Sequence, residues 1–148
     1  MRISIIDNFL LDREINLLLN FYQQNNHLKQ KYRDTFPISL GNLFIDIKNK
    51  YNKLSQEDQI DWWQIVHWPK GSFQNSHKDN ASEKTTLSSI TYLNDSFEGG
   101  ETFFVDGAIV KPKKGRTLLF DGKYYLHGVN PIINGNRFTI AAWYKKHD

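Results

Sequence analysis

The phrases His127-Gly128-Val129-Asn130-Pro131 and Gly135-Asn136-Arg137-Phe138-Thr139 follow one another closely, about fifty residues after the triplet His77-Lys78-Asp79. Side chains at positions i and i+2 of an extended strand point to the same side. The two outer residues of the triplet can therefore face one point while the lysine between them faces away. An HxD triplet alone is weak evidence, because such triplets also occur in surface turns.

The apolar pattern from position 61 onward predicts a series of short strands. We expect them at residues 63–68, 85–93, 102–105, 108–110, 117–120, 125–129 and 138–144. Gly, Pro, Asn or Asp separates most of these segments, as is typical of strands joined by turns. The pairs Gly99-Gly100, Asp106-Gly107 and Asp121-Gly122 are predicted turns. Many short strands with such breaks favour a barrel or a sandwich.

The first sixty residues have a different pattern and predict two helices after a short strand at 2–6. The first helix is expected from Asp12, as its N-cap, to about residue 25. Pro37 breaks the chain, and the second helix is expected at 39–54. Its apolar residues should pack against a sheet: Leu40, Leu43, Phe44, Ile47, Tyr51 and Leu54.

The predicted fold is mainly β, of the α+β class, in a single domain of 148 residues. A jelly-roll or cupin-like barrel is expected at about residues 61–145, braced by two helices within about residues 1–60. We expect the candidate site residues to lie inside the mouth of this barrel.

The composition excludes several kinds of site and partner. There is no cysteine, so the chain has no disulfide and no thiolate ligand, and a metal must be held by nitrogen and oxygen atoms. The net charge is only +3 and the lysines are scattered, so we expect no nucleic-acid partner. No apolar run is long enough to span a membrane. The N-terminus does not resemble a signal peptide. We expect a cytoplasmic monomer.

Two imidazoles and one carboxylate, from His77, Asp79 and His127, are the ligand set of non-haem Fe(II) oxygenases. Such a set leaves metal positions open for substrates. Arg137 offers a planar fork of donors that matches a carboxylate. The apolar segment 138–143 predicts that this arginine is buried and therefore needs a partner. Thr139 shares its face of the strand and is small enough to leave room for a slender diacid.

Further phrases lie between the triplet and His127. They are Thr91-Tyr92-Leu93-Asn94, Glu98-Gly99-Gly100-Glu101-Thr102-Phe103-Phe104 and Pro112-Lys113-Lys114-Gly115. In this order the set resembles the prolyl-4-hydroxylase-like branch of the 2-oxoglutarate- and Fe(II)-dependent dioxygenases, from about residue 68 to 143. The resemblance implies a double-stranded β-helix that uses Fe(II), 2-oxoglutarate and O₂, with ascorbate as reductant.

The resemblance also implies roles for particular residues. Arg137 and the hydroxyl of Tyr92 would bind the distal carboxylate of 2-oxoglutarate. The pocket would also be lined by Thr102, Thr139 and Trp143. A carboxylate at the position of Asp79 favours hydroxylation, because related halogenating enzymes lack it. Trp68 departs from the pattern, because many relatives have a tyrosine there that contacts the cosubstrate.

The substrate that the resemblance implies is a prolyl residue in a peptide or protein, hydroxylated as 2-oxoglutarate is decarboxylated to succinate. Substrate contacts are expected from the loops at 75–76 and 80–86. One alternative is the same chemistry on a free amino acid, a small metabolite or a modified base. Another is a cupin-like module that binds metal or ligand without turnover. The remaining histidines are expected to lie outside the site: His27, His67 and His147.

Overall fold

The computed structural model describes residues 3–55, 57–79 and 82–147. The helical elements are α1 (Asp12–Gln24), a short 3₁₀ helix (Asn26–Leu28) and α2 (Ile45–Asn52). The strands are β1 (Ser4–Ile6), β2 (Phe36–Ser39), β3 (Asp58–Trp68), β4 (Gln74–His77), β5 (Thr85–Tyr92), β6 (Glu98–Gly99), β7 (Thr102–Phe104), β8 (Ile109–Val110), β9 (Thr117–Phe120), β10 (His127–Val129), β11 (Ile132–Asn134) and β12 (Arg137–Lys146). Within these described ranges, no helix has the length and apolar character needed to cross a membrane.

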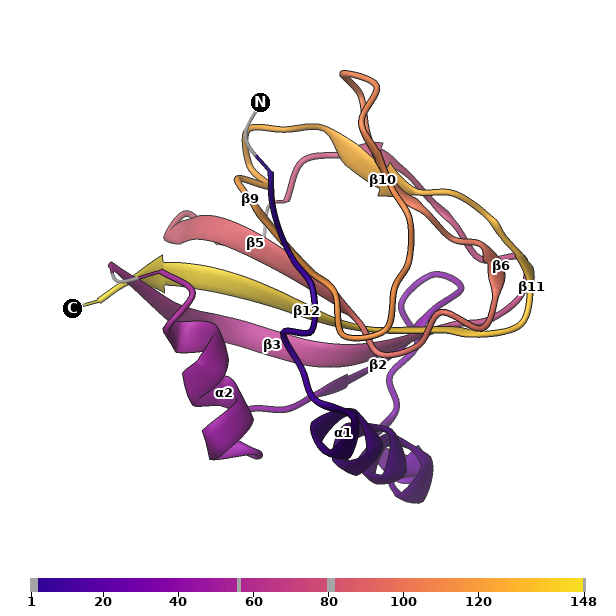
Figure 1. Cartoon of the computed structure of the whole chain (residues 1–148), viewed down its shortest axis with the longest axis horizontal. Helices are drawn as coiled ribbons and strands as arrows, with labels where there is room; N and C mark the ends of the chain where they lie inside the picture. Colours follow the sequence, from indigo (N-terminus) through magenta and orange to yellow (C-terminus); the bar gives the residue numbers. More distant parts are fainter. Residues whose placement is uncertain (1–2, 56, 80–81, 148) are drawn as a thin grey trace.

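Two antiparallel sheets form the barrel. The larger sheet has six strands in the order β1-β9-β5-β12-β3-β2, and the smaller has four in the order β4-β10-β7-β8. The long strands β3, β5 and β12 lie side by side, and the chain through β10 crosses over one face of them (Figure 1). The helices lie on the opposite, outer face of these strands (Figure 1). The predicted double-stranded β-helix braced by two helices is confirmed.

The main hydrophobic core fills the space between the helices and the larger sheet. Helix α1 contributes residues spaced three and four apart, which is the period of one helical face. The core includes Ile15, Leu18 and Tyr22 from α1, Ile47 and Tyr51 from α2, and Trp63, Ile65 and Ile140 from the sheet. This packing leaves the opposite face of the sheet free to line the barrel interior.

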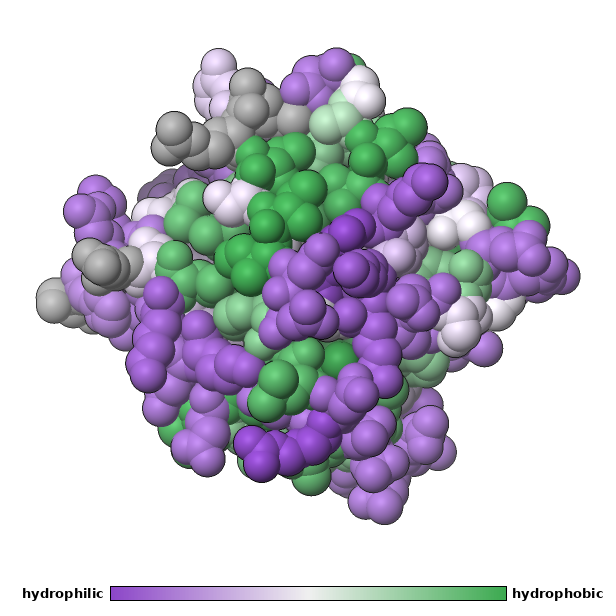
Figure 2. All heavy atoms as spheres, viewed as in Figure 1, coloured by the Kyte–Doolittle hydropathy of each residue, from purple (hydrophilic) through white to green (hydrophobic). Residues whose placement is uncertain are grey.

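A second apolar cluster joins the two sheets. It joins β7, β8 and β9 through Phe104, Val110, Leu118 and Phe120, all of which are buried. Figure 2 shows apolar residues on this side of the molecule, over the region where Figure 1 draws β1 and β9, with hydrophilic residues beside them.

The predicted helix at 39–54 is wrong in its first part. Residues 36–39 form β2 at the edge of the larger sheet, and α2 begins only at Ile45. Proline lacks a backbone N–H and is tolerated on an edge strand, so Pro37 lies within β2. Leu43, predicted to face the core, is 48% exposed.

Helix α1 also begins slightly differently from the prediction. Its N-cap is Leu11, and Asp12 is the first helical residue. The Leu11 N–H donates to Oε1 of Glu14 at 2.8 Å, so a side chain within the first turn stabilises the helix start. Of the first predicted strand, the residue at position 2 lies outside the described residues.

The predicted turn at Gly99-Gly100 is instead part of a small strand pair. Gly99 belongs to β6, which pairs with β11, and it has φ of +77°. A Cβ atom on Gly99 would lie 2.1 Å from the carbonyl oxygen of Pro131. Glycine is needed here both for the left-handed backbone and for the close approach of β11.

Gly99→Ala should therefore lower the free energy of unfolding by more than the roughly 1 kcal/mol that a left-handed non-glycine residue costs. Urea denaturation would measure the loss. Gly71→Ala is a matched control, because Gly71 has φ of +89° and nothing within 4 Å of its added Cβ. Equal losses in the two variants would show that the contact with Pro131 has no energetic weight.

Candidate active site

Two adjacent strands of the smaller sheet bring the predicted metal ligands together. His77 ends β4 and is the register partner of His127 on β10. Oδ1 of Asp79 lies 3.3 Å from Nε2 of each histidine. The three potential ligand atoms all lie within 4.8 Å of one another. An ion could be bound by all three at once.

Backbone carbonyls orient both imidazoles. Nδ1 of His77 lies 2.9 Å from the oxygen of Asn75, and Nδ1 of His127 lies 2.9 Å from the oxygen of Tyr125. A carbonyl can only accept, so each Nδ1 carries a hydrogen, and Nε2 is the ring nitrogen left to face Asp79 and, when it is unprotonated, a metal. Metal-binding histidines have this arrangement. The donor set therefore fits a divalent transition metal with affinity for nitrogen and oxygen.

The electrostatics of the trio favour an ionised carboxylate. Burial acts to raise the pKa of Asp79, but hydrogen bonds with His127, His77 and Ser88 outweigh it and hold that pKa well below its usual value. Burial likewise acts to lower the pKa of His77, but its hydrogen bond with Asp79 raises it overall. The site carries negative charge that a cation would neutralise.

The trio has one sheltered side and one open side. His127 is 4% exposed and packs against the ring of Phe120, with centroids 4.8 Å apart. The side chain of His77 is 29% exposed. Lys78 lies between His77 and Asp79 in the sequence and is exposed, as the strand alternation predicted. Ligands can therefore reach the trio from the side of His77.

Arg137 is buried at 1% exposure at the start of β12. Its Nε donates to the carbonyl of Gly100 at 3.0 Å and its Nη2 to the hydroxyl of Thr102 at 3.2 Å. Burial lowers the pKa of Arg137, although the nearby Tyr92 opposes this. Among the residues that the structure describes, no carboxylate pairs with this guanidinium. Its charge is left for an anion from outside the chain.

Aromatic rings surround the guanidinium. Its central carbon lies 4.8 Å from the ring centroid of Trp68 and 5.3 Å from that of Tyr92. The indole N–H of Trp68 is buried and, among the described residues, has no acceptor. Trp68 therefore adds an unpaired donor to a residue that already packs against the guanidinium, and a donor suits an anionic ligand.

Tyr92 and Thr102, two predicted pocket residues, bond to each other. Their hydroxyl oxygens are 2.6 Å apart, and both side chains are fully buried. Thr102 also accepts from Arg137, so its position is that of a support for the guanidinium. The contact of Tyr92 with a cosubstrate stays a prediction.

One cavity of about 1270 Å³ connects the trio with Arg137. Thr139 and Trp143 line it on the same face of β12 as Arg137, and their contact with a cosubstrate stays a prediction. Asn75 and Ser76 also line it, but they belong to β4 and not to a loop, and their contact with a substrate stays a prediction. Of the other predicted loop, residues 80–81 lie outside the described residues, 85–86 belong to β5, and none of residues 82–86 lines this cavity.

Two contributors to this site were not predicted from sequence. The turn before β2 places Tyr32 and Arg33 on the cavity wall. Ser88 on β5 donates to Asp79 across the barrel at 2.6 Å. Neither has a local sequence signal, because both contacts depend on how distant strands pack.

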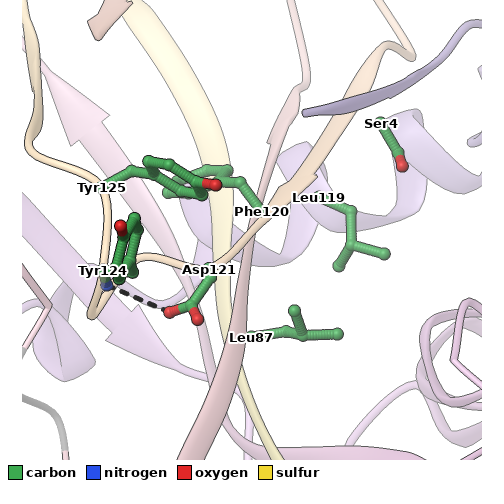
Figure 3. A pocket seen from close by; sticks show the side chains of 7 residues that line it. All are labelled: Ser4, Leu87, Leu119, Phe120, Asp121, Tyr124 and Tyr125. Atoms are coloured by element: carbon green, nitrogen blue, oxygen red, sulfur yellow. Dashed lines mark hydrogen bonds between the residues drawn. The ribbon is translucent and has the colours of Figure 1, made fainter. Parts of the chain in front are cut away.

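His67 and a smaller cavity lie apart from the trio and show structural contacts. His67 bonds to Asn136 at 2.8 Å and stacks on Phe138, as expected of a structural histidine. A cavity of about 480 Å³ lies beside Asp121 and Tyr124 (Figure 3). The carboxylate of Asp121 there accepts from the backbone N–H of Tyr124 at 3.1 Å (Figure 3). This hydrogen bond stabilises the turn between Asp121 and Tyr124.

Comparison with known families agrees with this geometry. The model of the 2OG-Fe(II) oxygenase superfamily matches residues 63–145, which include the trio and Arg137. The chain belongs to this superfamily. The resemblance that the ordered phrases indicated is thereby confirmed.

Related proteins include several prolyl hydroxylases. Prolyl 3-hydroxylase 2 of Homo sapiens is 39% identical over 64 residues, which are 38% of this chain and 9% of that protein. Prolyl 4-hydroxylase 2 of Arabidopsis thaliana is 24% identical over 136 residues, covering 59% of this chain and 46% of that protein. The chain thus spans less than half the length of these two relatives.

Solved structures share the whole fold of this superfamily member. The viral collagen prolyl hydroxylase of Paramecium Bursaria Chlorella virus-1, in complex with 2OG, has a TM-score of 0.81 at 21% identity, covering 100% of this chain and 97% of that one. A Pseudomonas putida prolyl-4-hydroxylase has a TM-score of 0.78 at 17% identity, covering 99% and 93%. At these identities the likeness concerns the fold alone.

Proposed function

We propose that this protein is an Fe(II)- and 2-oxoglutarate-dependent dioxygenase that hydroxylates prolyl residues in a peptide or protein. One observation carries the proposal. A single cavity joins a two-histidine, one-carboxylate trio to a buried arginine that has no acidic partner among the described residues. The first feature fits a metal with open positions, and the second fits the far end of a dicarboxylate.

The residues of the chain have distinct roles in this proposal. His77, Asp79 and His127 would hold Fe(II), which when bound supplies O₂ activation coupled to decarboxylation of 2-oxoglutarate. Asp79 is already ionised and needs to lose no proton. Arg137 would orient the distal carboxylate, and its burial strengthens that contact by excluding water. Ascorbate is proposed as the reductant that keeps the iron ferrous.

The cavity supports a polymeric substrate. Its volume of about 1270 Å³ is larger than the roughly 300–1000 Å³ of most small-molecule pockets. Side chains on its wall reach into solvent, since Tyr32 is 58% exposed and Trp62 is 51% exposed. A peptide chain could therefore enter and leave while one residue lies near the trio.

The sequence relatives support proline as the target residue. Their names divide between prolyl 3-hydroxylases and a prolyl 4-hydroxylase. The alignment with the Arabidopsis prolyl 4-hydroxylase covers the larger share of this chain. We therefore propose C4 of proline as the position that is hydroxylated.

Incubation with Fe(II), 2-oxoglutarate, ascorbate and proline-containing peptides should add one oxygen atom to proline. Mass spectrometry with fragmentation would locate the oxygen, and succinate would form in equal amount. Omitting O₂ should stop both products. The His127→Ala protein is the control for metal-dependent turnover, because it retains the rest of the cavity.

The alternatives predict different products. If peptides stay unmodified while free proline or another small molecule is oxidised, the dioxygenase proposal stands and the peptide substrate is wrong. If no succinate forms with any substrate pool although metal binds, the protein is a binding module. Hydroxylation at C3 would overturn only the proposed position.

A further inference from the structure

The two oxygens of the Asp79 carboxylate have different partners. Oδ1 lies 3.3 Å from Nε2 of both His77 and His127. Oδ2 instead accepts the hydroxyl hydrogen of Ser88 at 2.6 Å. A short bond from a hydroxyl to an ionised carboxylate is among the stronger hydrogen bonds in proteins. Oδ1 therefore faces the two histidines, and Oδ2 is bonded to Ser88 instead.

The Ser88 contact crosses the barrel. Ser88 lies on β5 of the larger sheet and is 2% exposed, whereas Asp79 follows β4 of the smaller sheet. The hydrogen bond from Ser88 thus restricts the rotation of the Asp79 side chain, and its donor lies on a strand of the other sheet. The side-chain conformation of Asp79 does not depend on its own loop alone.

Gly122 encloses the same carboxylate from another side. Its carbonyl accepts the N–H of Asp79 at 2.8 Å. A Cβ atom on Gly122 would lie 2.3 Å from Oδ2 of Asp79 and 2.4 Å from the hydroxyl of Ser88. Its φ is outside the left-handed region, so glycine is needed here for space and not for backbone conformation.

We propose that Ser88 is a positioning residue that, with the space left by Gly122, makes Asp79 a metal ligand through one oxygen only. This inference rests on the proposed metal site. Binding through both oxygens would occupy one more metal position. By retaining Oδ2, Ser88 would keep that position free for the cosubstrate or O₂ when a metal is bound.

The test is a Co(II) titration of the full chain, followed by visible absorption, with no turnover required. Ser88→Ala should weaken Co(II) binding by roughly 10- to 100-fold, the usual effect of losing an outer hydrogen bond to a ligand. It should also change the Co(II) spectrum, because the carboxylate is free to rotate. Ser88→Thr keeps the hydroxyl and should restore both properties.

Two further variants separate positioning from general stability. Ser89→Ala removes the neighbouring buried serine, whose hydroxyl makes no hydrogen bond among the described residues, and should leave Co(II) binding unchanged. Gly122→Ala keeps the Ser88 hydroxyl but displaces the carboxylate, so it should weaken Co(II) binding as Ser88→Ala does. If Ser88→Ala does not fold, Gly122→Ala provides the test in its place.

The possible outcomes are distinct. If the unaltered protein binds Co(II) and Ser88→Ala binds it with the same affinity and spectrum, the positioning role is wrong and the metal site stands. If Ser88→Ala and Ser89→Ala lower Tm equally with no change in Co(II) binding, Ser88 is only structural. If the unaltered protein binds no Co(II), the proposed metal site fails, and the inference fails with it.

Discussion

Replacing His127 with alanine should abolish metal-dependent turnover and leave the fold intact. His127 supplies one of three ligand atoms, and its ring is fixed by the carbonyl of Tyr125 and by Phe120. The loss of metal affinity should exceed the roughly 10- to 100-fold effect of an outer-shell change. Calorimetric titration with Fe(II) under anaerobic conditions would measure binding, and succinate formation would measure turnover.

The matched control for this variant is His67→Ala. His67 lies on β3 of the larger sheet and bonds to Asn136, so its loss removes an imidazole without touching the trio. Metal affinity should stay unchanged in His67→Ala. Full iron-dependent activity in His127→Ala would show that the trio is not the metal site.

Arg137→Ala should raise the apparent KM for 2-oxoglutarate by roughly ten- to a hundredfold, with little change in Fe(II) affinity. A charge-assisted contact of this kind is worth about 1.5–3 kcal/mol. Arg137 is buried and pairs with no carboxylate among the described residues, so a bound diacid would meet an otherwise uncompensated charge. Steady-state kinetics at saturating Fe(II) would measure the change.

Three further variants sharpen this result. Arg137→Lys keeps the charge but loses the planar fork, so its KM should rise less than that of Arg137→Ala. Tyr92→Phe should act in the same direction as Arg137→Ala but more weakly. Arg116→Ala removes an arginine that pairs with Asp7 at 2.7 Å at the surface, and the KM should not change. An unchanged KM in Arg137→Ala would contradict the assignment of the cosubstrate anchor.

The sequence predicted the barrel because its signals are local. Alternation of apolar residues and the breaks at Asp106-Gly107 and Asp121-Gly122 mark strands and turns within a few residues. The trio was predicted only in part from local spacing. The i, i+2 spacing of His77 and Asp79 places both side chains on one side of an extended chain, but the ordered set of phrases through Arg137 was needed to connect them with His127.

The remaining features depend on packing between distant segments. The edge position that tolerates Pro37 is set by strand order, which no local pattern reveals. The stacking of Trp68 on Arg137 follows from their register on β3 and β12. The bond from Ser88 to Asp79 joins strands of different sheets. Each of these contacts exists only once the barrel has closed.

The separation of the site between two sheets has a mechanical consequence. The trio belongs to the smaller sheet, whereas Arg137 belongs to β12 of the larger one. A diacid bound at both ends would span the interior and tie the sheets to each other. Part of its binding energy would then oppose any separation of the two sheets. The width of the barrel would therefore favour one length of diacid over shorter and longer acids of the same charge.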